Sequence, residues 1–298
     1  MNPTGCELSD WNFKSRYTFP SCSRKASLKN CIFYNLHTSS DGGAAYISQT
    51  SVDMVISEVL FSYCTTSGSY GSIFSHLKSC LVSYICNHYC QAGSSSHSSM
   101  LYTYDPYTND YNDCNFSVTT RCPPTESTNS YYFRVENGFI RGQSNNISHC
   151  NIRASPGIWF ESENSESRWT HFLLAHNSGD KIFYLSNNRD TNFKIANSNL
   201  IDNAQYNNGG TFIDNADPMV LDSCYFYGNT FSTFCSDKSK MTATKCAFYS
   251  NSFTNDVPGT KYVIKVPNVF VCIGASIDFT IKHDDFILFL LFLVAIFL

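Results

Sequence analysis

A short motif that recurs along almost the whole chain constrains the fold more than any other feature of the sequence. It consists of Cys or another small or apolar residue, then any residue, then an apolar residue, often with Asn three positions later. The apolar third positions are Phe33, Phe61, Val82, Phe116, Ile152, Leu174, Leu200, Phe226 and Phe248. Subtracting each of these numbers from the next gives 28, 21, 34, 36, 22, 26, 26 and 22, so six of the eight intervals lie between 21 and 28. A period of this length is typical of repeat architectures rather than of ordinary globular domains.

The two long intervals coincide with segments rich in loop-forming residues. Residues 91–113 and 121–130 contain many Pro, Ser, Asn, Asp and Gly residues, which favour turns and irregular loops. We therefore predict loop insertions at 91–113 and 121–130, within a single repeat that otherwise runs nearly from end to end.

Each repeat holds three short apolar segments rather than one. In the last third of the chain these are residues 193–195, 199–201 and 211–213, followed by 219–221, 225–227 and 231–234, with Asn, Asp, Gly and Ser between them. Only 15% of the residues are charged and 15% are aromatic, a composition that favours strands over helices. Three strands per turn, each pairing with its equivalent one repeat away, predict an all-β, right-handed parallel β-helix (solenoid).

The repeat divides the chain into four parts. We expect residues 1–26 to form an N-terminal segment or cap, 27–274 the parallel β-helix, and 275–285 a polar spacer. Residues 286–298 are thirteen apolar residues in a row, from Phe286 to Leu298, and we expect them to form a short hydrophobic helix.

Two residue types recur at fixed places in the motif. Asn177, Asn203, Asn229 and Asn251 each lie three positions after the apolar residue, which predicts a ladder of stacked amides with a structural role. Six of the 14 cysteines fall on the repeat and are expected to share one inward position as small buried hydrophobic residues: Cys31, Cys80, Cys114, Cys150, Cys224 and Cys246.

No set of residues predicts a catalytic centre, a metal site or a cofactor site. His76, Cys80, Cys86, His88 and Cys90 lie close together in the sequence, but their spacing fits no structural zinc pattern. Asp202, Asp214, Asp217 and Asp222 fall on neighbouring turns, yet Asp is also a common turn residue, and we find no basic partner at repeat spacing. A formal charge of −4, without a basic stripe, gives no support for nucleic-acid binding. We therefore expect no enzymatic activity.

Several motifs resemble the repeats of the polymorphic outer-membrane proteins of bacteria and related β-helix surface proteins of parasitic protists. That family is marked by Gly-Gly-Ala-aliphatic and Phe-x-x-Asn tetrapeptides. The chain matches the second in Phe226-Tyr-Gly-Asn229 and Phe248-Tyr-Ser-Asn251, and approaches the first in Gly42-Gly-Ala-Ala45 and Gly209-Gly-Thr-Phe212. The resemblance covers about residues 27–274 and implies a surface-exposed β-helix with an adhesion-like or structural role. The chain departs from the family in having no N-terminal signal peptide and no C-terminal β-barrel pattern.

The C-terminal tail leaves three interpretations open. As a helix, its thirteen residues would span about 20 Å, less than the roughly 30 Å of a bilayer core. It is a short membrane anchor, a glycolipid-anchor signal following the small residues Gly274, Ala275 and Ser276, or a hydrophobic cap on the solenoid. The first is favoured, which predicts a membrane-associated protein, with the cell surface as its expected site despite the missing signal peptide.

The sequence favours a non-enzymatic, membrane-associated surface protein that binds a host or cell-surface protein or glycan through its Tyr-, Asn- and Ser-rich faces. The alternatives are a polysaccharide-active lyase or glycoside hydrolase of the same fold, and a degenerate, truncated member of a larger family.

Overall fold

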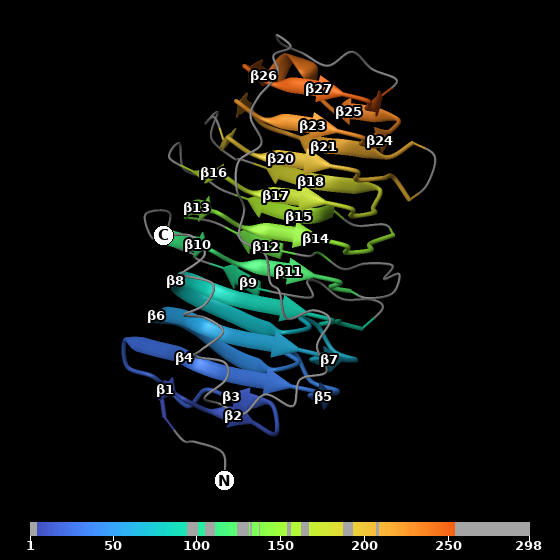
Figure 1. Cartoon of the computed structure of the whole chain (residues 1–298). Helices are drawn as coiled ribbons and strands as arrows, with labels where there is room; N and C mark the ends of the chain where they lie inside the picture. The colour runs from blue at the N-terminus through green and yellow to red at the C-terminus, as the bar shows by residue number, and fades with distance from the viewer. Residues whose placement is uncertain are drawn as a thin grey trace, which may run out of the picture.

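The computed structural model shows a parallel β-solenoid (Figure 1). It describes residues 5–93, 101–104, 111–123, 131, 133–136, 138–153, 156–161, 167–186, 193–206 and 209–253. Apart from one short 3-10 helix, Lys238–Lys240, the described elements are β-strands, and every pairing between them is parallel. The all-β solenoid expected from the repeat is confirmed.

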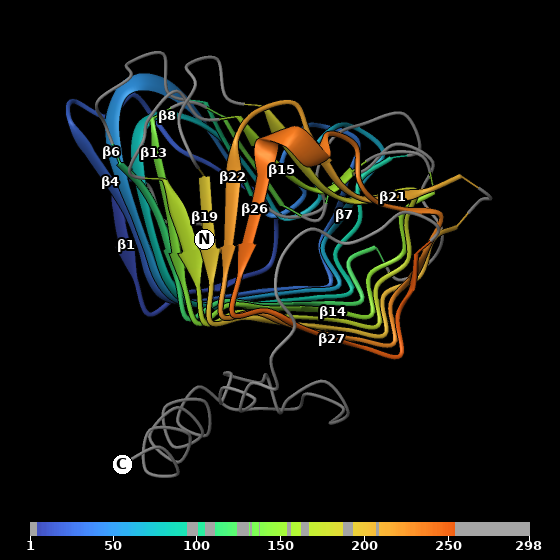
Figure 2. The same ribbon diagram turned by 90° about the horizontal axis from the view of Figure 1, so that it is seen from above.

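Each turn has three main faces, which are seen end-on in Figure 2. The first face contains β1 (Glu7–Ser9), β10 (Tyr111–Asn115), β13 (Phe139–Gln143), β16 (Arg168–Thr170), β19 (Phe193–Ala196), β22 (Met219–Asp222) and β26 (Met241–Thr244). The second contains β2 (Asn12–Phe13), β11 (Val118–Thr120), β14 (Asn146–Ser148), β17 (Leu173–Ala175), β20 (Asn199–Ile201), β23 (Tyr225–Tyr227) and β27 (Ala247–Tyr249). The third contains β3 (Tyr17–Thr18), β9 (Leu101–Tyr104), β12 (Phe133–Glu136), β15 (Pro156–Glu161), β18 (Lys181–Ser186), β21 (Thr211–Asn215) and β25 (Thr233–Cys235).

Three long strands near the N-terminus bend from one face to the next. β4 (Lys25–Tyr34) serves the first and second faces, whereas β6 (Ala45–Ser62) and β8 (Ile73–His88) serve all three. Two short pairs lie between the second and third faces: β5 (His37–Thr38) with β7 (Thr65–Thr66), and β24 (Thr230–Phe231) with β28 (Ser252–Phe253).

The second face has the most regular register, and it corrects the predicted one. Its central inward position is occupied in successive turns by Phe33, Phe61, Asn87, Thr119, Ile147, Leu174, Leu200, Phe226 and Phe248. Subtracting each number from the next now gives 28, 26, 32, 28, 27, 26, 26 and 22, which is a more even series than the predicted one. Val82, Phe116 and Ile152 were therefore assigned wrongly: Val82 lies on the first face, Phe116 at a corner and Ile152 beyond the second face.

From β4 onward, each second-face strand lies between two residues with left-handed backbone conformation, always five positions apart. The first corner consists of Asn30, Glu58, Tyr84, Phe116, Ser144, His171, Asn197, Ser223 and Lys245. The second consists of Asn35, Tyr63, Tyr89, Arg121, His149, His176, Asp202, Gly228 and Ser250. This conformation is costly for most side chains. It is stabilised here because the corner N–H donates to a carbonyl of the next turn, as from His176 to Ile201 at 3.0 Å.

Inward side chains of successive turns stack into a continuous apolar core, as the period-two pattern requires. Its widest member is Trp169, which is 1% exposed and stacks directly above Gly142. A Cβ on Gly142 would lie 2.2 Å from the indole Nε1, so only glycine leaves room for this ring.

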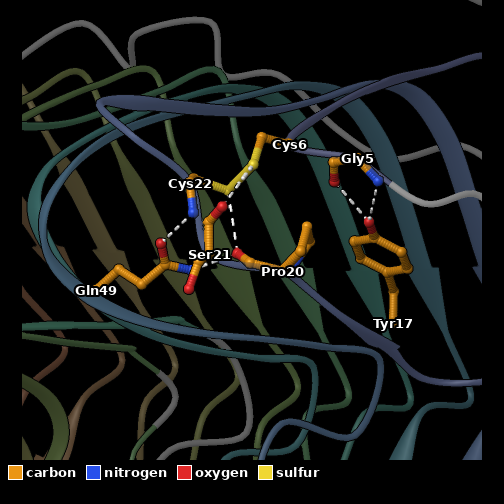
Figure 3. The surroundings of a disulfide bond; sticks show 7 residues. All are labelled: Gly5, Cys6, Tyr17, Pro20, Ser21, Cys22 and Gln49. Atoms are coloured by element: carbon orange, nitrogen blue, oxygen red, sulfur yellow. Dashed lines mark hydrogen bonds between the residues drawn. A yellow bond between two sulfur atoms is a disulfide. The ribbon is translucent and has the colours of Figure 1, made fainter.

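The N-terminal residues begin the solenoid rather than standing apart from it. β1 and β2 pair with β4, and β3 pairs with β6, so these strands within the predicted segment 1–26 belong to the ladder. A disulfide between Cys6 and Cys22 joins the start of this first turn to its end (Figure 3). Gln49, on β6, holds the closed turn by accepting a hydrogen bond from the Cys22 N–H and donating one to the Pro20 carbonyl.

The predicted insertion at 91–113 is shorter than expected, because it contains β9 and most of β10, both of which pair in the ladder. Residues 124–130 of the second insertion, and the spacer and tail at 275–298, lie outside the described residues. Within the described part of the chain, no helix is long and apolar enough to cross a membrane.

Candidate ligand-binding groove and corner column

The six aligned cysteines do not share one inward position, contrary to the prediction. Cys31, Cys224 and Cys246 directly follow the first corner, and Cys150 directly follows the second. Cys80 and Cys114 belong to the first face, in two different columns. All six are buried and free, so the expectation of small buried thiols is confirmed even though their alignment is not.

A different column unites the cysteines and asparagines. The residue after the second corner is, in successive turns, Leu36, Cys64, Cys90, Cys122, Cys150, Asn177, Asn203, Asn229 and Asn251. We call this the corner column. From Cys90 to Asn251 it is continuous, because the backbone N–H of one member donates to the side chain of the next turn: Cys90 to Cys122 Sγ (3.1 Å), Cys122 to Cys150 Sγ (3.4 Å) and Cys150 to Asn177 Oδ1 (3.0 Å).

The asparagine part is the amide ladder predicted from the sequence. Asn203 Oδ1 accepts from both the backbone N–H and the Nδ2 of Asn177, at 3.1 and 3.0 Å. Asn203 Nδ2 donates to the Leu174 carbonyl at 2.9 Å and to Asn229 Oδ1 at 2.9 Å. Because every polar atom of the buried amide is satisfied, the ladder is structural and offers nothing to a ligand.

The thiols of Cys122 and Cys150 are equally unsuited to binding from solution. Burial raises the pKa of Cys150 to about 12 and that of Cys122 well above its ordinary value. Protonated, buried thiols are poor nucleophiles and poor metal ligands. The corner column therefore holds the turns together.

The described residues form a groove of about 520 Å³ on the outer side of the first face, over β10, β13, β16, β19 and β22. It is lined by Asp113, Asn115, Arg141, Gly142, Gln143, Arg168, Thr170, Lys194, Ala196, Asn197 and Asp222. We call it the first-face groove.

Charged residues on five successive strands follow the groove along the solenoid axis. Asp113, Arg141, Arg168 and Lys194 occupy one outward row in register. Asp222 lies on the next strand, two residues along from the register partner of Lys194 and opposite Ala196 in the neighbouring outward row. Asp113 binds Arg141 through two hydrogen bonds of 2.7 Å, and Lys194 binds Asp222 at 2.8 Å. The hydrogen bond from Lys194 lowers the pKa of Asp222, so this carboxylate stays ionised at neutral pH. Arg168 lies between the two pairs and forms no hydrogen bond or ion pair with a described residue.

The neutral side chains of the groove are also without partners among the described residues. Asn115, Gln143 and Thr170 share a second outward row, and Asn197 occupies the first corner beside them. Their amide and hydroxyl groups form no side-chain hydrogen bond within the described structure. Tyr111 extends the polar strip at one end: it is 43% exposed, its ring stacks on Phe139 at 4.6 Å, and the Arg141 guanidinium lies 4.1 Å from its centroid.

The residues weighed as sites from the sequence do not come together. Asp202 lies at the second corner beside His176, Asp214 binds Lys181 on the third face, and only Asp222 belongs to the groove. His76, Cys80 and Cys90 are on the third face, the first face and the corner column. Among the residues the structure describes, no three His, Cys, Asp or Glu side chains are placed to hold a metal ion.

The groove was missed although its signal is in the sequence. The numbers of Asp113, Arg141, Arg168 and Lys194 increase by 28, 27 and 26. These are repeat spacings, so the expectation that no basic residue stands at repeat spacing was wrong. The incorrect register in the middle of the chain concealed the row.

No protein-family model matches the chain, and no match was found among curated proteins or solved structures.

Proposed function

We propose that this protein is a non-enzymatic, membrane-associated surface β-helix that binds a glycan along the first-face groove. The observation that carries the proposal is a groove of about 520 Å³ lined by Arg168 and four amide or hydroxyl side chains without partners among the described residues. Such groups hydrogen-bond sugar hydroxyls, and the rigid ladder beneath them fixes their positions before a ligand arrives. A groove along successive strands suits an extended chain better than a compact metabolite.

The exposed ring of Tyr111 strengthens the choice of a sugar ligand. An aromatic side chain offers an apolar body and a polar tip, which matches the mixed surface of a pyranose. Its contact with the Arg141 guanidinium at 4.1 Å holds the ring at the end of the groove.

Binding is favoured over hydrolysis by the separation of the carboxylates. Asp113 and Asp222 lie four strand spacings apart, about 19 Å along the axis, whereas glycoside hydrolases place their two carboxyl groups within about 10 Å. Each is also tied to a cation, which suits an acid or base role poorly. The alternative of a polysaccharide-active enzyme predicts that groove-bound chains are cleaved.

Three features support a place at the cell surface. The disulfide Cys6–Cys22 suits an oxidising compartment. The resemblance to polymorphic outer-membrane protein repeats, with their right-handed winding, points the same way. The apolar residues 286–298 would attach the protein to a membrane, as a short anchor or through a glycolipid that replaces them.

The proposal is tested by a glycan array probed with the full chain and with the double variant Asn115→Ala/Gln143→Ala. We expect wild-type binding to at least one glycan class without release of fragments, and loss of that binding in the double variant. Thr242→Ala, on the same face beyond the groove, is the matched control. Equal binding by all three proteins would place the ligand elsewhere, and fragment release would favour the enzyme.

Exposure on the cell is a separate question. Antibody access to an epitope tag inserted at Ser95 distinguishes a β-helix that faces the outside of the cell from one that faces the inside. Labelling of intact cells is expected, whereas labelling only after permeabilisation would contradict the surface assignment.

A further inference from the structure

The charges of the first-face groove form a fixed order along the axis. From β10 to β22 they are Asp113, Arg141, Arg168, Lys194 and Asp222, one on each strand. Three cations and two carboxylates give a net charge of +3 − 2 = +1. The two ends are neutral ion pairs, so the unbalanced positive charge lies in the middle, at Arg168.

The two outer cations are already committed to their partners. Arg141 donates through Nε and Nη2 to the two oxygens of Asp113, both at 2.7 Å. Lys194 donates to Asp222 at 2.8 Å. Arg168 is exposed and makes no such bond with a described residue, so its guanidinium can present the planar fork that matches a carboxylate or a sulfate ester.

We infer that the first-face groove selects a glycan segment carrying one anionic group, a carboxylate or a sulfate ester, which Arg168 binds. The inference rests on the proposed glycan-binding function and names the ligand class of the same groove. The neutral remainder of the segment extends along both sides of Arg168, against Asn115, Gln143, Thr170 and Asn197.

The same charge order disfavours a uniformly charged polymer. Anionic groups two strands from Arg168, about 10 Å away, would meet Asp113 on one side and Asp222 on the other. The cations there are already paired, so the added anionic groups lose hydration and face a carboxylate, and each contributes repulsion rather than affinity. The aspartates thus set a specificity against heavily charged chains.

The test uses sets of array glycans that share one neutral backbone and carry no acid, one carboxylate, one sulfate ester, or an acid on every sugar. The full chain is compared with Arg168→Gln, with Arg168→Lys, and with Lys29→Gln, which removes an exposed cation from the same face outside the groove. Because Arg168 is exposed and forms no hydrogen bond or ion pair with a described residue, thermal unfolding should be unchanged in Arg168→Gln.

The expected result is strongest binding to the members with one acid. Arg168→Gln should weaken it about 10- to 100-fold, the range for a lost hydrogen bond to a charged group. Binding to the neutral members should stay within about twofold, Arg168→Lys should be intermediate, and Lys29→Gln unchanged. Comparing the member with one carboxylate and the member with one sulfate ester shows which of the two acids Arg168 prefers.

Three results would overturn the inference. If neutral members bind as well as single-acid members and Arg168→Gln changes nothing, the groove binds glycans but does not select an acid. If the fully charged members bind best, with a steep salt dependence, the charge order does not discriminate. If no member binds in a groove-dependent way, the proposed function itself fails.

Discussion

Along the corner column, the asparagines from Asn177 to Asn251 and the cysteines from Cys64 to Cys150 occupy equivalent positions but connect the turns differently. Each amide accepts from the turn before it and donates to a carbonyl at 2.7–3.0 Å. The thiols accept a backbone N–H at 3.1–3.4 Å or donate to a carbonyl at 3.4–3.5 Å. From Cys64 to Asn251 the position is therefore occupied by small side chains that can accept a hydrogen bond, and only the asparagine part forms a full hydrogen-bond ladder.

The largest difference between the asparagine part and the cysteine part of the corner column should appear when one side chain of the column is removed. Asn203→Ala deletes four hydrogen bonds, leaves the Asn177 N–H buried without its acceptor and removes one of the donors to the Leu174 carbonyl. We expect a loss of about 3 kcal/mol in the free energy of unfolding, measured by urea denaturation. Cys122→Ala should cost about 1 kcal/mol, and Asn12→Ala, at an exposed position of β2, should cost almost nothing. Equal losses for Asn203→Ala and Cys122→Ala would remove the distinction.

The thiol part should be sensitive to alkaline pH, unlike the amide part. Burial raises the pKa of Cys150 to about 12 and that of Cys122 well above its ordinary value, whereas a thiol in the unfolded chain titrates near 8.5. Because the folded pKa is raised, the stabilisation is complete below about pH 8.5 and is lost as the pH rises toward the folded value.

The expected size of this alkaline loss is about 2 kcal/mol per thiol at pH 10. Urea midpoints at pH 7.5 and 10 measure it. The free energy of unfolding should decline by about 2 kcal/mol less in Cys150→Asn than in the wild type. Tyrosines and lysines also titrate in this range, but they do so in both proteins, so the difference reports the Cys150 thiol alone. An identical decline in wild type and variant would contradict the assignment.

The inward column of the second face shows a related contrast. It is apolar from Ile147 to Phe248 but contains Asn87, which is fully buried and whose two amide atoms have no hydrogen-bond partner among the described residues. Replacing it with leucine removes the unsatisfied groups at nearly constant volume. We expect Asn87→Leu to stabilise the protein by about 1–2 kcal/mol, seen as a higher urea midpoint. The reverse change, Leu200→Asn, should destabilise it, and a stabilising Leu200→Asn would contradict this reasoning.

The smallest expected effect lies at the junction of the two parts. Cys150 already receives the Cys122 N–H, and its Sγ lies 3.9 Å from the Thr119 carbonyl, the counterpart of the bond from Asn177 to Ile147. Cys150→Asn would extend the amide ladder by one turn. We expect a gain of up to about 1 kcal/mol, and a loss above about 1 kcal/mol would show that the cysteine part lacks room for amides.

The contrast also explains what the sequence could predict. Between Leu174 and Asn251 the apolar residue and the asparagine recur together, so two markers fix the register and both the strands and the amide ladder are correctly placed. Between Cys80 and Cys150 the only marker is cysteine, which the fold uses at three different inward positions. Several alignments then fit equally well, and Val82, Phe116 and Ile152 were placed wrongly.

The first-face groove was not predicted because of the same register error. Outward residues carry no hydrophobic pattern of their own, so Arg141, Arg168 and Lys194 become a row only when the strands beneath them are aligned. The pairing of Asp113 with Arg141, and the absence of such a pair at Arg168 among the described residues, depends on side-chain positions that spacing alone does not define.

The most direct test of the whole account is a crystal structure of the full chain with the oligosaccharide that binds best on the array. We predict a sugar chain lying along the solenoid axis over β10 to β22, with an acidic group against the Arg168 guanidinium. A ligand bound on the second or third face, with the first-face groove empty, would contradict it.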